Sequence, residues 1–257
     1  MQISVVNQEN RVVATSQPCG YGVALEYKQS YQAGDTVVLT TEQPGLYELQ
    51  IDECLGRCIV YLQQEARFQI PTEEAKRTCY PKLAFTGDSH LMTLSPFCSP
   101  ERRNLALNVY DHHHTQGIHP HASANVETRG EMVFAARNAI DGVFANHSHG
   151  DYPYASWGIN RDPNAEMRLE FGRSVLIDEI RLTLRADWPH DSWWTEAVVT
   201  DSNQKRYVLP LTKSPLPQIF PIKPTTMTSL TLGELKKADD ASPFPALTQI
   251  EVWGTEA

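Results

Sequence analysis

The stretch VLIDEIRLTLR (residues 175–185) decides the fold class. Its second half alternates apolar and polar residues, which places Ile180, Leu182 and Leu184 on one face of a strand. Similar short runs recur along the chain, separated by Gly, Pro, Asp and Asn. They include TVVLTT (36–41), GLYELQID (45–52), GRCIVYLQ (56–63), MRLEF (167–171), YVLPL (207–211) and QIEVWG (249–254). Only residues 131–140 and 234–240 look briefly helical, so the pattern predicts an all-β protein built of β-sandwiches.

The composition changes near residue 110. All five cysteines lie at or before Cys98, whereas all five tryptophans, from Trp157 onward, lie after it. This break predicts two β-sandwich domains, residues 1–110 and 118–257, with the boundary between residues 108 and 120. We expect the joining segment, NVYDHHHTQGIHP (108–120), to be open to proteases at residues 112–117.

Charge and hydropathy exclude several classes of partner. The net charge is −9 with no basic run, so nucleic acid and anionic membrane surfaces are poor partners. No run of about 18 apolar residues could span a bilayer, and no secretory signal precedes residue 20, which predicts a cytoplasmic protein. In that compartment the cysteines are expected to be free thiols, including the closely spaced Cys54 and Cys58.

The segment LRADWPHDSWW (184–194) carries the densest mixture of aromatic and ionisable residues. It follows the strand that ends near Arg185, and such loops often carry function on a rigid frame. Tryptophan faces stack on sugar rings, and charged side chains bond the hydroxyls. We therefore expect ligand-binding roles for Arg185, Asp187, Trp188, His190, Asp191 and Trp194. The alternative is that the tryptophans fill the core and Arg185 forms a structural ion pair with Asp187.

Histidines form a second group of candidate residues. The segment up to residue 121 supplies His119 and His121, and NHSHGD (146–151) supplies His147, His149 and Asp151. If these loops converge, neutral imidazoles and a carboxylate could bind a sugar or a transition metal such as zinc. His112, His113 and His114, on the joining segment, are expected to be simply solvated.

The C-terminal part resembles a known family. The segments RNAIDG (137–142), SWG (156–158), LEFGR (169–173), IDEIRLTLR (177–185) and IEVWG (250–254) follow one another in the order of a discoidin-like domain. This coagulation-factor type C, or galactose-binding-like, fold is a jelly-roll sandwich with binding loops clustered at one end. The variant found here resembles a bacterial subgroup of carbohydrate-binding-like proteins. The resemblance implies that Trp157 and either His147 or His149 join Arg185, Asp187, His190 and Asp191 in one pocket.

Some members of this family hold a structural calcium ion. The resemblance assigns its carboxylate ligands to Asp141 and Glu251, because hard cations prefer oxygen ligands. The following segment, VFANHSHGD (143–151), lacks the further ligands expected there, and Asp141 could instead only cap its turn.

Three functions follow from these patterns. The first is a non-catalytic carbohydrate-binding protein. The second is an enzyme acting on a sugar or glycoside, with His190 and Asp191 as acid–base groups. The third is a module that binds another protein. The sequence contains no nucleophile or metalloprotease motif, and the first function is favoured by analogy of fold.

Overall fold

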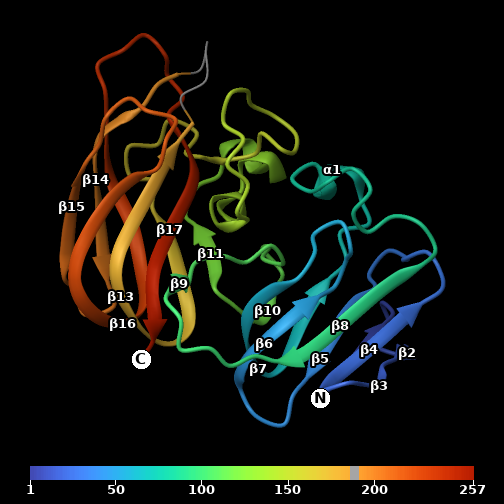
Figure 1. Ribbon diagram of the computed structural model, residues 1–257. Helices are drawn as coiled ribbons and strands as arrows, with labels where there is room; N and C mark the ends of the chain where they lie inside the picture. Colours follow the sequence, from blue (N-terminus) through green and yellow to red (C-terminus); the bar gives the residue numbers. More distant parts are fainter. Residues whose placement is uncertain (186–190) are drawn as a thin grey trace.

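A computed structural model describes residues 1–185 and 191–257. It confirms the all-β class: two antiparallel sheets lie side by side, one from each end of the chain (Figure 1). None of the described helices is long and apolar enough to cross a membrane. All five cysteines are free thiols, as predicted.

The N-terminal sheet runs in the order β2-β1-β5-β7-β6-β8-β4-β3, with β10 also paired to β7. Its strands are β1 (Gln2–Val6), β2 (Val12–Thr15), β3 (Gln17–Cys19), β4 (Gly22–Tyr27), β5 (Thr36–Thr40), β6 (Gly45–Gln50), β7 (Cys58–Gln69), β8 (His90–Pro96) and β10 (Gln116–His119). Strand β1 also contacts β4 and β8, so the sheet curves around its own core. Ile3, Leu39 and Leu62 are fully buried there.

The C-terminal sheet runs in the order β12-β17-β13-β16-β14-β15, with β11 paired to β13 and β9 to β17. Its strands are β9 (Arg103–Asn104), β11 (His121–Ala124), β12 (Trp157–Gly158), β13 (Met167–Leu184), β14 (Trp194–Asp201), β15 (Arg206–Pro210), β16 (Gln218–Lys237) and β17 (Ala246–Glu256). Register shifts interrupt the pairing of β13 with β16, and such bulges bend long strands around a core. Ile180, Leu182 and Leu184 are all fully buried, on the face that their alternation predicted.

Helical structure is limited to short segments. They are α1 (Glu74–Arg77), η1 (Thr128–Gly130), η2 (Met132–Phe134) and η3 (Ala136–Ile140). The helical expectation for residues 131–140 is thus met by two 3-10 turns. The expectation for residues 234–240 is wrong, because residues 234–237 extend β16 and pair with β14, with Trp194 opposite Lys237.

The chain crosses between the two sheets more than once near residue 110. Strand β9 adds to the C-terminal sheet, β10 returns to the N-terminal sheet, and β11 joins the C-terminal sheet again. Pro120 alone separates β10 from β11. The predicted boundary falls inside this exchange, and within it Asp111 and His112 are buried. Independent folding of residues 1–110 and 118–257, and cleavage at 112–117, stay predictions.

Candidate functional site

A small pocket lies at one end of the C-terminal sheet. We call it the end pocket; its volume is about 210 Å³. Strand pairing assembles it, because Gly158 of β12 lies opposite Ala246 of β17 and brings residues 159–161 beside residues 244–246. Thr128, Arg129 and Phe134 form another wall. Segments distant in sequence therefore meet on a rigid frame.

Two aromatic rings, each covered by an arginine, line the end pocket. The guanidinium of Arg129 lies 5.4 Å from the ring centroid of Phe134, and that of Arg161 lies 5.0 Å from that of Phe244. Such cation–π pairs hold a charge beside an apolar face. The end pocket thus offers both a surface for stacking and donors for hydrogen bonds.

The backbone of the end pocket is unusual. Arg129, Asn160 and Arg161 have positive φ angles of 56°, 49° and 62°. Non-glycine residues rarely adopt this left-handed region, and structures that hold them there often do so at functional sites. The hydroxyl of Thr128 accepts a hydrogen bond from the Asn160 amide at 2.9 Å, which ties the two turns together. A Cβ on Gly158 would approach this hydroxyl to 2.7 Å, so the close approach requires glycine.

The end pocket contains two residues that the sequence analysis selected. Arg185 and His149 both line it. Arg185 is 4% exposed, its amide donates to the carbonyl of Ala246 at 3.0 Å, and its Nη1 donates to the hydroxyl of Ser156 at 3.3 Å. Its side chain is therefore fixed rather than free to reach outward. Asp187, Trp188 and His190 lie outside the described residues.

Two tryptophans expected to contact a ligand, Trp194 from the loop segment and Trp157 through the family resemblance, are in the core. Trp157 and Trp194 are 0% and 1% exposed, and their ring centroids lie 6.5 Å apart. The indole Nε1 of Trp157 donates to the carbonyl of Val126 at 3.1 Å. This corrects the expectation that they face a ligand: buried rings fill the sandwich, which was the alternative reading of these residues.

Other predicted residues also lie elsewhere or are engaged. Asp191 forms an ion pair with Lys213, whose hydrogen bond lowers the pKa of this carboxyl, so the group is held as a carboxylate. The ring Nε2 of His147 lies 2.9 Å from the Tyr154 hydroxyl. Asp151 lines a different hollow, between the two sheets.

His119 and His121 lie where the two sheets meet, not at the end pocket. His121 Nδ1 is 2.6 Å from a carboxylate oxygen of the buried Asp111, and this hydrogen bond raises the pKa of His121. Burial lowers the pKa of His119, whose ring packs over Gly172 so closely that a Cβ there would lie 2.4 Å from it. Within residues 1–185 and 191–257, no three His, Cys, Asp or Glu side chains converge as a metal-binding group.

The hollow between the sheets is larger, at about 590 Å³; we call it the interdomain cleft. Two ion pairs lie on and around its rim. Lys76 Nζ lies 2.7 Å from a carboxylate oxygen of Glu73, and the guanidinium of Arg129 donates two hydrogen bonds to the Glu131 carboxylate at 2.6 and 2.7 Å. His112 forms part of its wall, and burial lowers the pKa of its imidazole to about 3. The buried Nε2 of His112 has no hydrogen-bond partner among the described residues.

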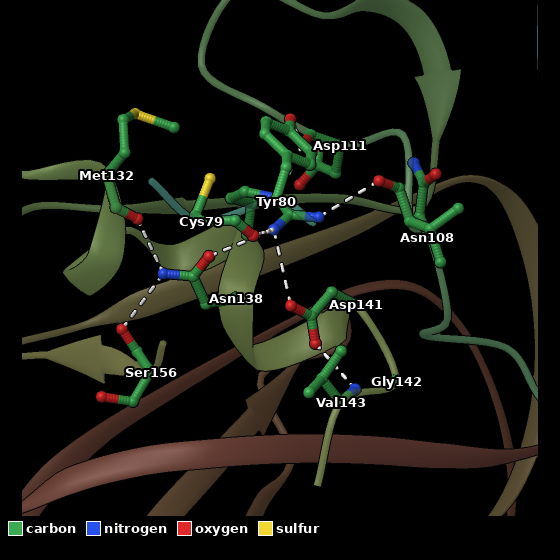
Figure 2. A network of polar contacts seen from close by, with 12 residues as sticks. Cys79, Tyr80, Asn108, Asp111, Met132, Asn138, Asp141, Gly142, Val143 and Ser156 are labelled. Carbon is green, nitrogen blue, oxygen red and sulfur yellow. Dashed lines mark hydrogen bonds and ion pairs between the residues drawn. The ribbon is translucent and has the colours of Figure 1, made fainter. Parts of the chain in front are cut away.

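Arg137, from the RNAIDG segment, fastens the two sheets together. Its guanidinium donates to the carbonyls of Cys79, Val109 and Asp111 at 3.3, 3.1 and 2.9 Å. It also lies 4.6 Å from the ring centroid of Tyr80. The neighbouring Asn138 amide bridges the carbonyls of Met132 and Ser156, so the whole segment is held by polar contacts (Figure 2).

The predicted calcium ligands do not fit a calcium site. Asp141 lies 3.4 Å from the guanidinium of Arg137, and its other oxygen accepts a hydrogen bond from the amide of Val143 at 2.8 Å (Figure 2). The same oxygen also accepts a hydrogen bond from the Gln249 side chain at 2.8 Å. Glu251 instead accepts a hydrogen bond from the indole of Trp253 at 3.2 Å. Burial raises the pKa of Asp141 to about 6, against the lowering effect of Arg137. The positive charge beside Asp141 is supplied by the protein itself.

Comparison with known proteins gives no family assignment. No model of a known protein family matches the chain, and no curated protein does. Among solved structures, a selenomethionine-labelled mutant of chitosan-binding module 1 from a chitosanase/glucanase of Paenibacillus sp. IK-5 is 16% identical. The match covers 60% of this chain and 100% of the module, with a TM-score of 0.43.

Two further structures show the same likeness. The family 32 CBM from C. perfringens NanJ, in complex with galactose, is 16% identical over 51% of this chain and 91% of its own, with a TM-score of 0.39. The lectin domain of Lectinolysin, complexed with Lewis B antigen, is 14% identical over 60% of this chain and 97% of its own, with a TM-score of 0.43. At such identities the likeness concerns the fold alone.

Sequence reasoning missed most of the end pocket. Arg129, Phe134, Asn160, Arg161 and Phe244 were not selected. One signal was present: GINRDPN (158–164) follows a strand and is rich in turn residues, as a loop at a sandwich end would be.

Proposed function

We propose that this chain is a non-catalytic carbohydrate-binding protein and that the end pocket is its ligand site. One observation carries the proposal: two aromatic rings and three arginines line a single hollow at the end of a sandwich. Aromatic rings stack on the apolar C–H faces of sugars, and fixed donors select the hydroxyl pattern. Pockets for drug-sized ligands span roughly 300–1,000 Å³. A volume of about 210 Å³ therefore suits one sugar ring.

Binding is favoured over catalysis by what the described groups do. Phe134, Phe244 and Arg161 can hold a ligand, whereas general acid catalysis needs a group that gives up a proton near the working pH. Asp191, the acid–base candidate within the described residues, is kept ionised by Lys213. Carbohydrate binding is therefore favoured over the enzyme function.

The proposal is tested by a glycan array on the full chain, followed by calorimetric titration of the best ligand. Phe244→Ala should weaken binding at least about tenfold, because aromatic anchors in a pocket typically contribute more than 1 kcal/mol. Phe144→Ala is the matched control, since Phe144 is 42% exposed and lies outside the end pocket. Loss of binding in both variants or in neither, or no glycan bound at all, would overturn the proposal.

A further inference from the structure

The end pocket differs in charge from the protein around it. The chain carries a net charge of −9. Yet the described lining of this pocket contains three arginines, one histidine and no aspartate or glutamate. An arginine whose charge is not paired attracts anions.

The three arginines are not equivalent. The guanidinium of Arg129 donates two hydrogen bonds to the carboxylate of Glu131, which neutralises much of the charge of Arg129. Arg185 is buried and donates to Ser156. Arg161 is exposed and forms no ion pair with any carboxylate in the described part of the chain. It is the arginine whose donors are best placed to meet a ligand.

The position of Arg161 also suggests the shape of the anion. Its planar guanidinium lies over the Phe244 ring, so an apolar face and a forked donor are adjacent. A carboxylate accepts two parallel hydrogen bonds from such a fork. A sugar acid of the uronic type carries both matching parts, a C–H face and a planar carboxylate, on one ring.

We infer that the end pocket selects sugar rings bearing a carboxylate over their neutral counterparts, and that Arg161 is the residue that reads the carboxylate. This inference rests on the proposed function and names its ligand class. Arg161 is a specificity residue here, because Phe134 and Phe244 would bind acidic and neutral rings alike.

The test compares matched sugars on the full chain by calorimetry or saturation-transfer NMR. One set is galacturonic acid, its methyl ester and galactose; a second is glucuronic acid, its methyl ester and glucose, which covers another hydroxyl pattern. We expect the acid to bind at least about tenfold more tightly than its ester in one set, as charge-assisted hydrogen bonds are strong. Raising the salt concentration should narrow the difference.

Variants separate the role of Arg161 from general charge. Arg161→Gln should abolish the preference for the acid, so that acid and ester bind with equal affinity, and Arg161→Lys should keep only part of the preference. Arg168→Gln is the control, since Arg168 is an exposed arginine of β13 that pairs with Glu170 outside the end pocket. Equal binding of acid and ester, or a preference that survives Arg161→Gln, would overturn this inference and leave carbohydrate binding standing. Binding of no sugar in any form would overturn the proposed function as well.

Discussion

Arg137 and Arg161 make the same kind of contact in two regions of the molecule, with different consequences. The guanidinium of Arg137 lies 4.6 Å from the Tyr80 ring centroid, and that of Arg161 lies 5.0 Å from that of Phe244. Arg137 is buried and its donors are used by three carbonyls and Asp141, whereas Arg161 is exposed and has no carboxylate partner among the described residues. An arginine over a ring holds the structure together where its donors are satisfied, and we propose that it binds a ligand where they are not.

The largest effect is expected from Arg137→Met. Removing the guanidinium leaves Asp141 without its counter-charge and three carbonyls without a donor, all between the two sheets. Breaking a buried pair by removing one partner typically costs about 3–5 kcal/mol. Urea unfolding should show a loss of this size. In the control Arg168→Met, at an exposed pair, the change should be below about 0.5 kcal/mol. If Arg137→Met lowers the free energy of unfolding by less than about 1 kcal/mol, Arg137 does not hold the two sheets together.

A second effect, on the free energy of unfolding, is expected near Arg137 when the pH falls. Burial, with the nearby charges of His114 and Arg137, lowers the pKa of His112 to about 3. Between pH 6.5 and about 3, the His112 imidazole is therefore protonated in the unfolded chain but not in the folded chain. Stability should fall as the pH drops through this window, by up to about 1.4 kcal/mol per unit.

The variant His112→Asn isolates this effect. Its amide oxygen can still accept the hydrogen bond that the His114 amide donates to His112 Nδ1, but it does not titrate. Asp141, with its pKa raised to about 6, acts in the opposite direction between pH 3.8 and 6 and is common to both proteins. Unfolding free energies measured from about pH 7 to about pH 4 should fall less steeply in the variant. Parallel curves would show that His112 is protonated equally in both states.

A smaller effect is expected from freeing the second arginine of the end pocket. Glu131→Gln removes the carboxylate that holds Arg129, so two guanidiniums rather than one become open to an acidic sugar. Because exposed ion pairs are weak, the gain in affinity should be about two- to fivefold. Titration of the acid and of its methyl ester checks this, since only the acid should gain. A gain shared by both would mean that Glu131 blocks the pocket sterically.

No effect is expected from calcium. Arg137 already supplies a positive charge to Asp141, and Glu251 is bonded to Trp253. A ligand that binds only the folded state raises its melting temperature. Melting curves of the chelated protein with and without added calcium should coincide. A rise on adding calcium would restore the assignment of Asp141 and Glu251 as ligands.

The strand pattern could be predicted from the sequence because it is local. Alternation alone places Ile180, Leu182 and Leu184 in the core. Residues 234–240 were misjudged because lysines and a short apolar pattern suit a helix, whereas pairing with β14 decides the matter. That pairing joins segments far apart in sequence, which periodicity cannot show.

The site was harder to predict for the same reason. Arg161 and Phe244 meet only because β12 pairs with β17. Residue type also did not show whether a side chain faces the core or the solvent. Trp157 and Trp194 were expected to contact a ligand, yet both fill the core. One clue about calcium was visible, because Arg137 stands four residues before Asp141 and could supply the charge of a cation.

The central claim is that the end pocket, and not the larger interdomain cleft, holds the ligand. The most direct test is a titration of the isotope-labelled chain with the best-binding sugar, followed by backbone amide chemical shifts. We predict that the largest shifts fall at residues 128, 129 and 134, 158–161 and 244–246, which line the end pocket. Saturable shifts confined to residues 69–80 and 112–114, which line the interdomain cleft, would contradict the account.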